Sequence, residues 1–293
     1  MSTTKTKPLQ PLKGVRILSL ALNLPGPAAL MRCRQLGARC VKLEPPGGDP
    51  MARYSQSAYA QLQQGIKVLT ADLKSEAGQK VLQRELAKTD VLLTSFRPSA
   101  LAKLGLGWQT LHRLYPALSL ITIVGSPGER AEEPGHDLTY LAESGLVPGL
   151  ELPATLYADM GGSLVASEAV LQATLTQHVK GQGVFIEVAL SDAAAYLALP
   201  RQWGLTQPAG AVGGAHAGYR VYPCKNGRVA VAALEPHFAA ALCAAAGVEA
   251  SGMKAMFAPA TQQAIAAFLL TQTRKQLDQL AVDKDIPLHT LSK

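Results

Sequence analysis

Three short segments of the sequence combine an ionisable side chain with a backbone signal that can position it. The first, PGHD (134–137), stands directly before the apolar helical stretch LTYLAESG. His136 would then lie beside the free N–H groups of a helix start, which can bind an oxyanion. From spacing alone the simpler interpretation is favoured, namely that Asp137 caps the helix beside a surface histidine.

The other two segments each contribute a carboxylate. Asp159, in YADMGG (157–162), stands where the N-cap of a small-residue helix would stand, and capping alone explains it. The glycine pair after it costs helix stability and indicates that a ligand or another backbone comes close. Glu235, in EPHF (235–238), follows the apolar run VAVAAL. It either ends a strand in solvent or orients a histidine through a carboxylate–imidazole hydrogen bond.

The sequence lacks several common motifs for nucleotide binding, hydrolysis and metal binding. The loop after the first apolar run reads LNLPGP and not G-x-G-x-x-G, and neither a Walker A motif nor a G-x-S-x-G elbow occurs. NAD, ATP and serine-hydrolase chemistry therefore have little support. The four cysteines form no C-x-x-C pair, so we expect buried thiols and no metal site or disulfide framework.

Composition and charge narrow the class of ligand. The chain has 293 residues, 48% hydrophobic and 17% charged, which is typical of a globular protein with a sizeable core. The formal charge of +7 is spread along the chain, so an anionic small molecule such as coenzyme A fits better than nucleic acid. No stretch is long and apolar enough for a membrane span or a signal core, so we expect a cytoplasmic protein.

The elements that would position these residues alternate along the chain. Apolar runs predict strands at 15–22, 39–44, 67–73, 90–95 and 118–124, with helices at 28–36 and 75–88 between them. A long helix at 159–179, a strand at 184–190 and a helix to about 204 follow. Such alternation indicates an α/β fold with a doubly wound parallel sheet. Ligands of these sheets bind beyond the carboxyl ends of the strands, which points to the loops 23–27, 45–53 and 125–137.

The remaining chain predicts a second, smaller α+β domain. Residues 205–218 are rich in glycine, proline and alanine and read as a linker. Runs at 219–222 and 228–234 predict a hairpin around Asn226-Gly227. The expected organisation is a disordered leader at 1–11, a large domain at 12–204, the linker, and a small domain at 219–293.

Several long segments resemble the class III CoA-transferase family. They include GVRILSLALNLPGPAALMRCRQLGARCVKLEPPGGDPM, LTADLKSEAG, DVLLTSFRPSALAKLGLGWQTL and GQGVFIEVALSDA, and the similarity covers most of residues 12–290. The resemblance implies a Rossmann-like large domain with a small domain. It also implies a homodimer whose two chains interlock as linked rings. Family members normally continue beyond the point that matches Lys293, so interlocking is left open.

Within that family, three segments look like those of α-methylacyl-CoA racemases: GHDLTYL (135–141), ADMGG (158–162) and ALEPHF (233–238). The resemblance implies that His136, paired with Glu235, is one base and Asp159 the other, while the helix opening at Asp137 holds the enolate oxygen. The implied activity interconverts (2R)- and (2S)-2-methylacyl-CoA thioesters in fatty acid metabolism. No covalently bound cofactor is expected, because coenzyme A is part of the substrate.

The coenzyme A contacts implied by the resemblance are Lys42, Arg53 and Arg97. These residues lie in or near the loop after the second strand and in FRPSALAKLGLG. Ordinary solvated surface charge is the simpler interpretation of Lys42 and Arg53, and it explains Arg97 as well as a phosphate contact does.

Two departures from the family pattern keep alternatives open. The usual glycine-rich segment after the fifth strand reads IVGSPG and continues with Glu129, Glu132 and Glu133, which are unfavourable beside a polyanion. The basic segment before the third strand is reduced to QQGIK. The alternatives are a CoA transferase that uses Asp159 as acyl carrier, and a non-catalytic relative that retains the fold.

Overall fold

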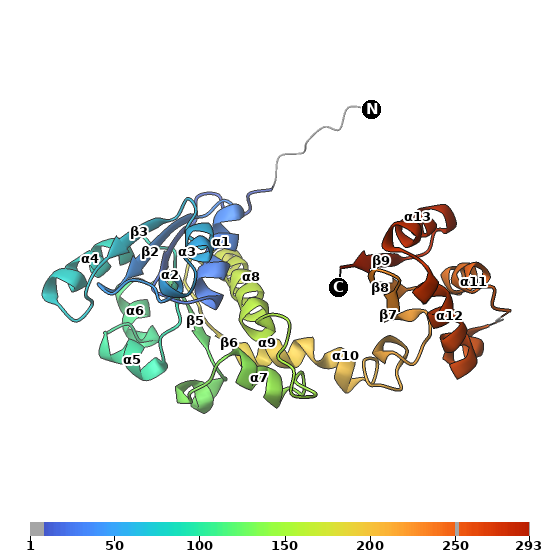
Figure 1. The fold of residues 1–293 in the computed structure, drawn as a ribbon. Coiled ribbons are helices and arrows are strands. Elements are labelled where there is room, and N and C mark those ends of the chain that lie inside the picture. The colour runs from blue at the N-terminus through green and yellow to red at the C-terminus, as the bar shows by residue number, and fades with distance from the viewer. Residues whose placement is uncertain (1–8, 250–251, 293) are drawn as a thin grey trace. The chain divides into compact units, whose positions relative to one another are not determined.

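The computed structural model describes residues 9–249 and 252–292 of the chain (Figure 1). They form two compact units, Met1–Ala198 and Leu199–Lys293, and each is described below by itself. Of the predicted leader at 1–11, residues 1–8 lie outside the described residues. Within those residues, no helix is long and apolar enough to cross a membrane.

The larger unit is built on a six-stranded sheet in the order β3-β2-β1-β4-β5-β6, and every neighbouring pair is parallel. The predicted α/β class with a doubly wound parallel sheet is confirmed. The order reverses between β1 and β4, which is where such folds open a crevice for ligands beyond the carboxyl ends of the strands. The strands are β1 (Arg16–Ser19), β2 (Arg39–Glu44), β3 (Lys67–Thr70), β4 (Val91–Thr94), β5 (Ser119–Val124) and β6 (Phe185–Ala189).

Alternate residues of the strands supply two separate cores, as the period of two in a strand requires. Ile17 packs with helices α1 (Pro25–Gln35) and α8 (Tyr157–Lys180) on one face of the sheet. Leu18 packs on the other face, with α4 (Glu76–Leu86), α5 (Pro98–Lys103) and α6 (Trp108–Leu114). Short helices α2 (Met51–Tyr54), α3 (Gln56–Leu62), η1 (Gly128–Glu132) and α7 (Asp137–Glu143) complete the layers.

Proline explains two differences between the predicted and observed helices. The sequence predicts a helix from Ala28, but α1 begins at Pro25, because the missing N–H of a proline costs nothing in the first turn. A single helix is predicted after β6, whereas α9 (Leu190–Leu197) ends before a separate α10 (Leu199–Gln202). Pro200 cannot donate the hydrogen bond that would continue the first helix.

The smaller unit has a three-stranded antiparallel sheet in the order β7-β8-β9, with its helices packed on one core. The predicted hairpin is confirmed as β7 (Tyr219–Cys224) and β8 (Gly227–Ala232). The third strand, β9 (Leu288–Leu291), is not predicted from the sequence. The helices are η2 (Ala211–Gly213), α11 (Pro236–Ala245), η3 (Met253–Phe257), α12 (Pro259–Thr271) and α13 (Arg274–Lys284).

Candidate active site

His136 is the residue that precedes the first turn of α7, on the loop that follows β5. The hydroxyl of Thr139 fixes its backbone, accepting from the His136 N–H at 3.1 Å and donating to the His136 carbonyl at 2.7 Å. The side chain itself is exposed. An anchored backbone with an exposed imidazole suits a group that must reach a substrate proton.

Asp137 lies next to His136 in α7, but its carboxylate serves a different helix. The side chain is buried, with 5% exposure, and its Oδ1 accepts a 3.0 Å hydrogen bond from the backbone N–H of Asp159. The sequence suggests Asp159 as the N-cap of α8, and that prediction is wrong: the N-cap is Leu156, and Asp159 lies in the first turn. The Asp137 carboxylate thus provides a hydrogen-bond acceptor for a backbone N–H in the first turn of α8, which has no partner within its own helix.

Asp159 is a half-buried carboxyl with an unusual proton affinity. Burial raises its pKa to about 6, the nearby Asp137 carboxylate adds to the rise, and His136 opposes it. The side chain of His136 is therefore near enough to Asp159 to affect the pKa of its carboxyl. A carboxyl of this pKa exchanges protons readily close to neutral pH, as a general acid or base must.

Tyr140 is a further member of the cluster to which the sequence assigned no role. Its phenol lies over Gly125 and Gly135, since a Cβ at either glycine would collide with the Tyr140 side chain. Burial raises the pKa of Tyr140, and the Asp159 carboxylate contributes to the shift while Arg97 opposes it. The only sequence signal for this residue is its place in the segment GHDLTYL.

The glycine pair after Asp159 is explained by helix packing. A Cβ at Gly162 would collide with the Leu190 side chain, and one at Gly161 would come within 3.2 Å of Leu197. Both neighbours belong to α9, so the pair lets α8 and α9 approach closely. The close approach predicted from the sequence is therefore that of another helix.

Lys42 does not face solvent. Its side chain is fully buried, and its ammonium pairs with the Glu44 carboxylate at 2.9 Å and with Asp49. Asp49 in turn accepts from the backbone N–H groups of Asn23 at 3.0 Å and Met51 at 2.9 Å. The cluster ties the loops after β1 and β2 together. We therefore leave Lys42 out of the proposed coenzyme A contacts.

Arg53 and Arg97 are both exposed. Arg53 lies in the last turn of α2, and Arg97 immediately precedes α5. These helices follow β2 and β4, so both arginines belong to the carboxyl-end side of the sheet, where a doubly wound fold binds its ligand. Either guanidinium is available for a phosphate group.

Two of the glutamates in the loop after β5 have protein partners. The Glu132 carboxylate accepts from the N–H and the hydroxyl of Ser99 at the start of α5, at 2.6 and 2.9 Å. Glu133 pairs with Arg130 at 3.0 Å. These carboxylates thus hold the loop and its neighbour α5, which reduces the conflict with a polyanionic ligand that the sequence suggests.

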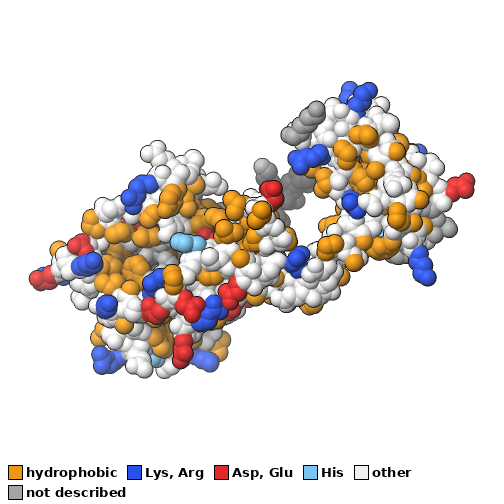
Figure 2. Space-filling model, turned by 60° about the horizontal axis from the view of Figure 1, so that its bottom comes forward, with side chains coloured by type: hydrophobic (Ala, Val, Ile, Leu, Met, Phe, Trp, Pro, Cys, Tyr) orange, Lys and Arg blue, Asp and Glu red, His pale blue; other side chains and the backbone are white. Residues whose placement is uncertain are grey.

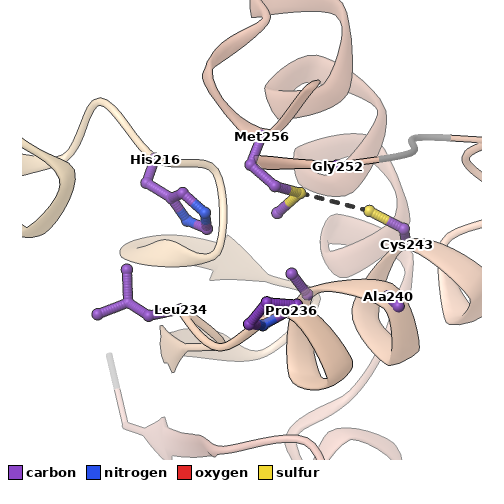
Figure 3. Close-up of a pocket in the computed structure, with 8 residues that line it drawn as sticks. His216, Leu234, Pro236, Ala240, Cys243, Gly252 and Met256 are labelled. Carbon is purple, nitrogen blue, oxygen red and sulfur yellow. Dashed lines mark hydrogen bonds between the residues drawn. The ribbon is translucent and has the colours of Figure 1, made fainter. Parts of the chain in front are cut away.

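Glu235 belongs to the smaller unit, where it precedes the first turn of α11 with its side chain exposed. Its pairing with His136 stays a prediction. The flanking Leu234 and Pro236 line a small enclosed pocket of about 70 Å³, into which the ring of His216 points (Figure 3). A pocket of this size has room for a few water molecules, so it is not the site of an acyl-CoA.

Hydrophobic side chains surround the larger unit's candidate site. Figure 2 brings forward the lower side of Figure 1, where α5 and α7 lie, and shows apolar side chains gathered there among charges of both signs. Leu138, Tyr157 and Met160, the sequence neighbours of the candidate residues, are each at least 40% exposed. Exposed apolar surface beside ionisable groups suits a ligand that is part hydrocarbon.

Comparison with curated proteins finds both transferases and racemases. The chain is 32% identical over 203 residues to succinyl-CoA–D-citramalate CoA-transferase of Chloroflexus aurantiacus, which covers 64% of this chain and 50% of the relative. It is 31% identical over 245 residues to α-methylacyl-CoA racemase of Homo sapiens, covering 78% and 62%. The mouse racemase is 31% identical over 267 residues, covering 85% and 68%. The matches thus span half to two thirds of the relatives' lengths.

Solved structures agree on the fold. The crystal structure of a hypothetical protein from Mycobacterium tuberculosis matches with a TM-score of 0.83 at 24% identity, covering 98% of this chain and 86% of that one. A CaiB/BaiF family protein from Brucella suis matches with a TM-score of 0.82 at 21% identity, covering 98% and 85%. A family model described as CoA-transferase family III matches residues 12–293. The chain belongs to CoA-transferase family III.

Proposed function

We propose that this family member is an α-methylacyl-CoA racemase, which interconverts the (2R) and (2S) forms of a 2-methylacyl-CoA thioester. The observation that carries the proposal is the pair formed by His136 and Asp159, an exposed imidazole near a half-buried carboxyl with a pKa of about 6. Epimerisation by two proton transfers needs one acid–base group on each face of the α-carbon, and these two side chains are the candidates.

The chemistry proceeds in two proton transfers. In one direction the His136 imidazole takes the α-proton, and protonated Asp159 returns a proton to the opposite face; in the other direction the roles are exchanged. A carboxyl with a pKa of about 6 can hold or release that proton near neutral pH. Glu235 as the carboxylate partner of the imidazole is part of this proposal and rests on the family resemblance of the segment ALEPHF.

The negative charge on the carbonyl oxygen needs stabilisation between the two transfers. The first N–H groups of α7, those of Asp137 and Leu138, have no partner within their own helix and lie beside His136. They form a natural oxyanion site at a helix N-terminus. The Asp137 carboxylate itself is engaged by the Asp159 N–H, so it acts by holding α8 in position.

Coenzyme A would be bound as part of the substrate and not as a resident cofactor. Arg53 and Arg97 offer guanidinium groups at the carboxyl ends of β2 and β4, which suit its phosphates. The exposed apolar side chains near Asp159 would face the acyl chain. A homodimer, expected from the family resemblance, and a cytoplasmic location, expected from the sequence, accompany this proposal.

Exchange of the α-proton tests the proposal. A single stereoisomer of a 2-methylacyl-CoA, incubated with the protein in heavy water, should take up deuterium at the α-carbon and lose its stereochemical purity. Uptake no faster than in a protein-free control would exclude the racemase and leave the CoA transferase or a non-catalytic family member.

A CoA transferase is the second candidate, because a transferase relative matches at 32% identity, the same level as the racemases. In that mechanism the Asp159 carboxylate attacks the thioester carbonyl, the C–S bond breaks, and coenzyme A leaves as a thiolate. The acyl group is then held as a mixed anhydride. Hydroxylamine would convert this anhydride to a hydroxamate on Asp159, which peptide mass spectrometry detects, whereas a racemase gives no such adduct.

A further inference from the structure

A basic cleft lies at the amino-terminal edge of the parallel sheet, opposite the edge that carries the candidate active site. Arg16, Arg39 and Lys67 begin the adjacent strands β1, β2 and β3. With Arg34 and Lys88 they line an open cleft of about 680 Å³, in which the one carboxylate is that of Glu85. The whole chain has a formal charge of +7, so much of its surplus gathers here.

The cations of the cleft lack carboxylate partners. Among the described residues, none of the five takes part in a salt bridge. The Glu85 carboxylate is 3.4 Å from the Nε of Arg84, a residue that does not line the cleft. The Nε of Arg16 is buried and has no hydrogen-bond partner in the described part of the chain. Like charges this close repel one another, and a bound anion would relieve the repulsion.

One guanidinium of the cleft packs on bare backbone. Gly65 has a φ of +72°, and a side chain there would collide with the guanidinium of Arg34. The absence of a side chain at Gly65 thus makes room for the half-buried Arg34 at the cleft. Arginine presents its donors in a fork that matches two oxygens of a phosphate.

We propose that this cleft binds a small polyphosphate anion, at a site separate from that for the acyl-CoA. One phosphate group would neutralise only part of the row of cations, whereas linked phosphates can pair with several of them at once. The volume of the cleft is in the range of small-ligand sites and admits a nucleoside triphosphate. The ligand is either inorganic or the phosphate tail of a nucleotide.

Calorimetric titration of the full chain, without added coenzyme A, tests the proposal. Tripolyphosphate and ATP are titrated separately at low salt, about 50 mM, because such binding weakens steeply with salt. We expect saturable binding with one site per chain. Replacing the exposed Arg39, Lys67 and Lys88 by glutamine should weaken it at least about tenfold. If tripolyphosphate and ATP bind with equal affinity, the cleft recognises the phosphates alone. If ATP binds more tightly, the ligand is a nucleotide.

A matched control removes the same charge elsewhere. Lys225, Lys275 and Lys284, which are exposed in the smaller unit, are replaced by glutamine, and binding should change less than about twofold. The proposal is overturned if no saturable binding occurs, if the control triple variant loses as much affinity, or if coenzyme A displaces tripolyphosphate one for one. Tighter binding of citrate, or of a short DNA duplex, would show that the ligand class is wrong.

Discussion

The backbone N–H of Asp159 donates a 3.0 Å hydrogen bond to the buried carboxylate of Asp137, which joins the first turn of α8 to the start of α7. This bond places the carboxyl of Asp159 near His136, the residue that precedes Asp137. The same contact brings a second negative charge close to Asp159 and so contributes to its raised pKa. One side chain thus both positions the candidate acid–base group and adjusts its proton affinity.

Replacing Asp137 by asparagine separates these two effects. The amide side chain of the Asp137→Asn variant retains an oxygen that can accept from the Asp159 N–H but carries no charge. The pKa of Asp159 should therefore fall below about 6. In the direction in which the Asp159 carboxylate takes the α-proton, the acidic limb of kcat/KM, which reports ionisation in the free enzyme, should move to lower pH. A limb that stays in place would mean that Asp137 does not tune Asp159.

Asp159 should also affect stability in a pH-dependent way. Its folded-state pKa is raised from 3.8 to about 6, so in this window the folded protein binds more protons than the unfolded one. The free energy of unfolding therefore falls as the pH rises between these two pKa values. Above the folded-state pKa the ionised carboxyl continues to destabilise the folded protein by the same amount. Asp159→Asn should be more stable than wild type by about 1 kcal/mol near pH 7, a value discounted for partial exposure.

Denaturant unfolding of the Asp159→Asn variant at two pH values checks this prediction. The two proteins should have the same free energy of unfolding at about pH 3, where the carboxyl is largely protonated in both the folded and the unfolded state, and differ at about pH 7. An equal difference at both pH values would contradict the assigned pKa and point to a packing effect of the amide.

His136→Ala should lower the rate of α-proton exchange by about 10²–10⁴-fold, the usual contribution of a proton-transfer group. The backbone of His136 is held by Thr139, so the change should leave α7 intact. His178→Ala is the matched control, since that histidine lies in the last turn of α8, at the other end of the helix from Asp159. Equal rates for both variants and the wild type would remove His136 from the mechanism.

The buried cluster of Lys42, Glu44 and Asp49 leads to a separate prediction about stability. Lys42→Met leaves the carboxylates of Glu44 and Asp49 buried without their cation, which should destabilise the protein by about 3–5 kcal/mol. Lys80→Met, which breaks an exposed pair with Glu76, should cost less than about 0.5 kcal/mol. Thermal and denaturant unfolding measure both. Similar small losses for the two variants would show that the buried cluster is not needed for stability.

The strands and most helices of the larger unit could be predicted from the sequence because their signals are local. Runs such as VRILSLAL and LSLITIV are apolar throughout, as strands buried on both faces must be. The start of α4 also carries a local signal, because serine is a preferred N-cap residue and the Ser75 hydroxyl accepts from the Gly78 N–H. The strand order itself requires the three-dimensional structure.

The roles of Asp137 and Lys42 could not be predicted, because their partners are set by tertiary packing. Asp137 acts on a helix that begins about 20 residues later along the chain, and no periodicity signals that contact. Lys42 is an ordinary strand lysine in the sequence and becomes buried only when Asp49 folds back onto it. The strand β9 was missed because a four-residue run after Pro287 carries little signal of its own.

The most direct test of the account is deuterium uptake by a (2R)-2-methylacyl-CoA in heavy water, followed by mass spectrometry and by chiral analysis of the acyl group. The account predicts that one deuterium enters at the α-carbon while the (2S) form accumulates, and that His136→Ala and Asp159→Asn each suppress the conversion. Uptake no faster than in a protein-free solution would contradict the claim that His136 and Asp159 move the α-proton.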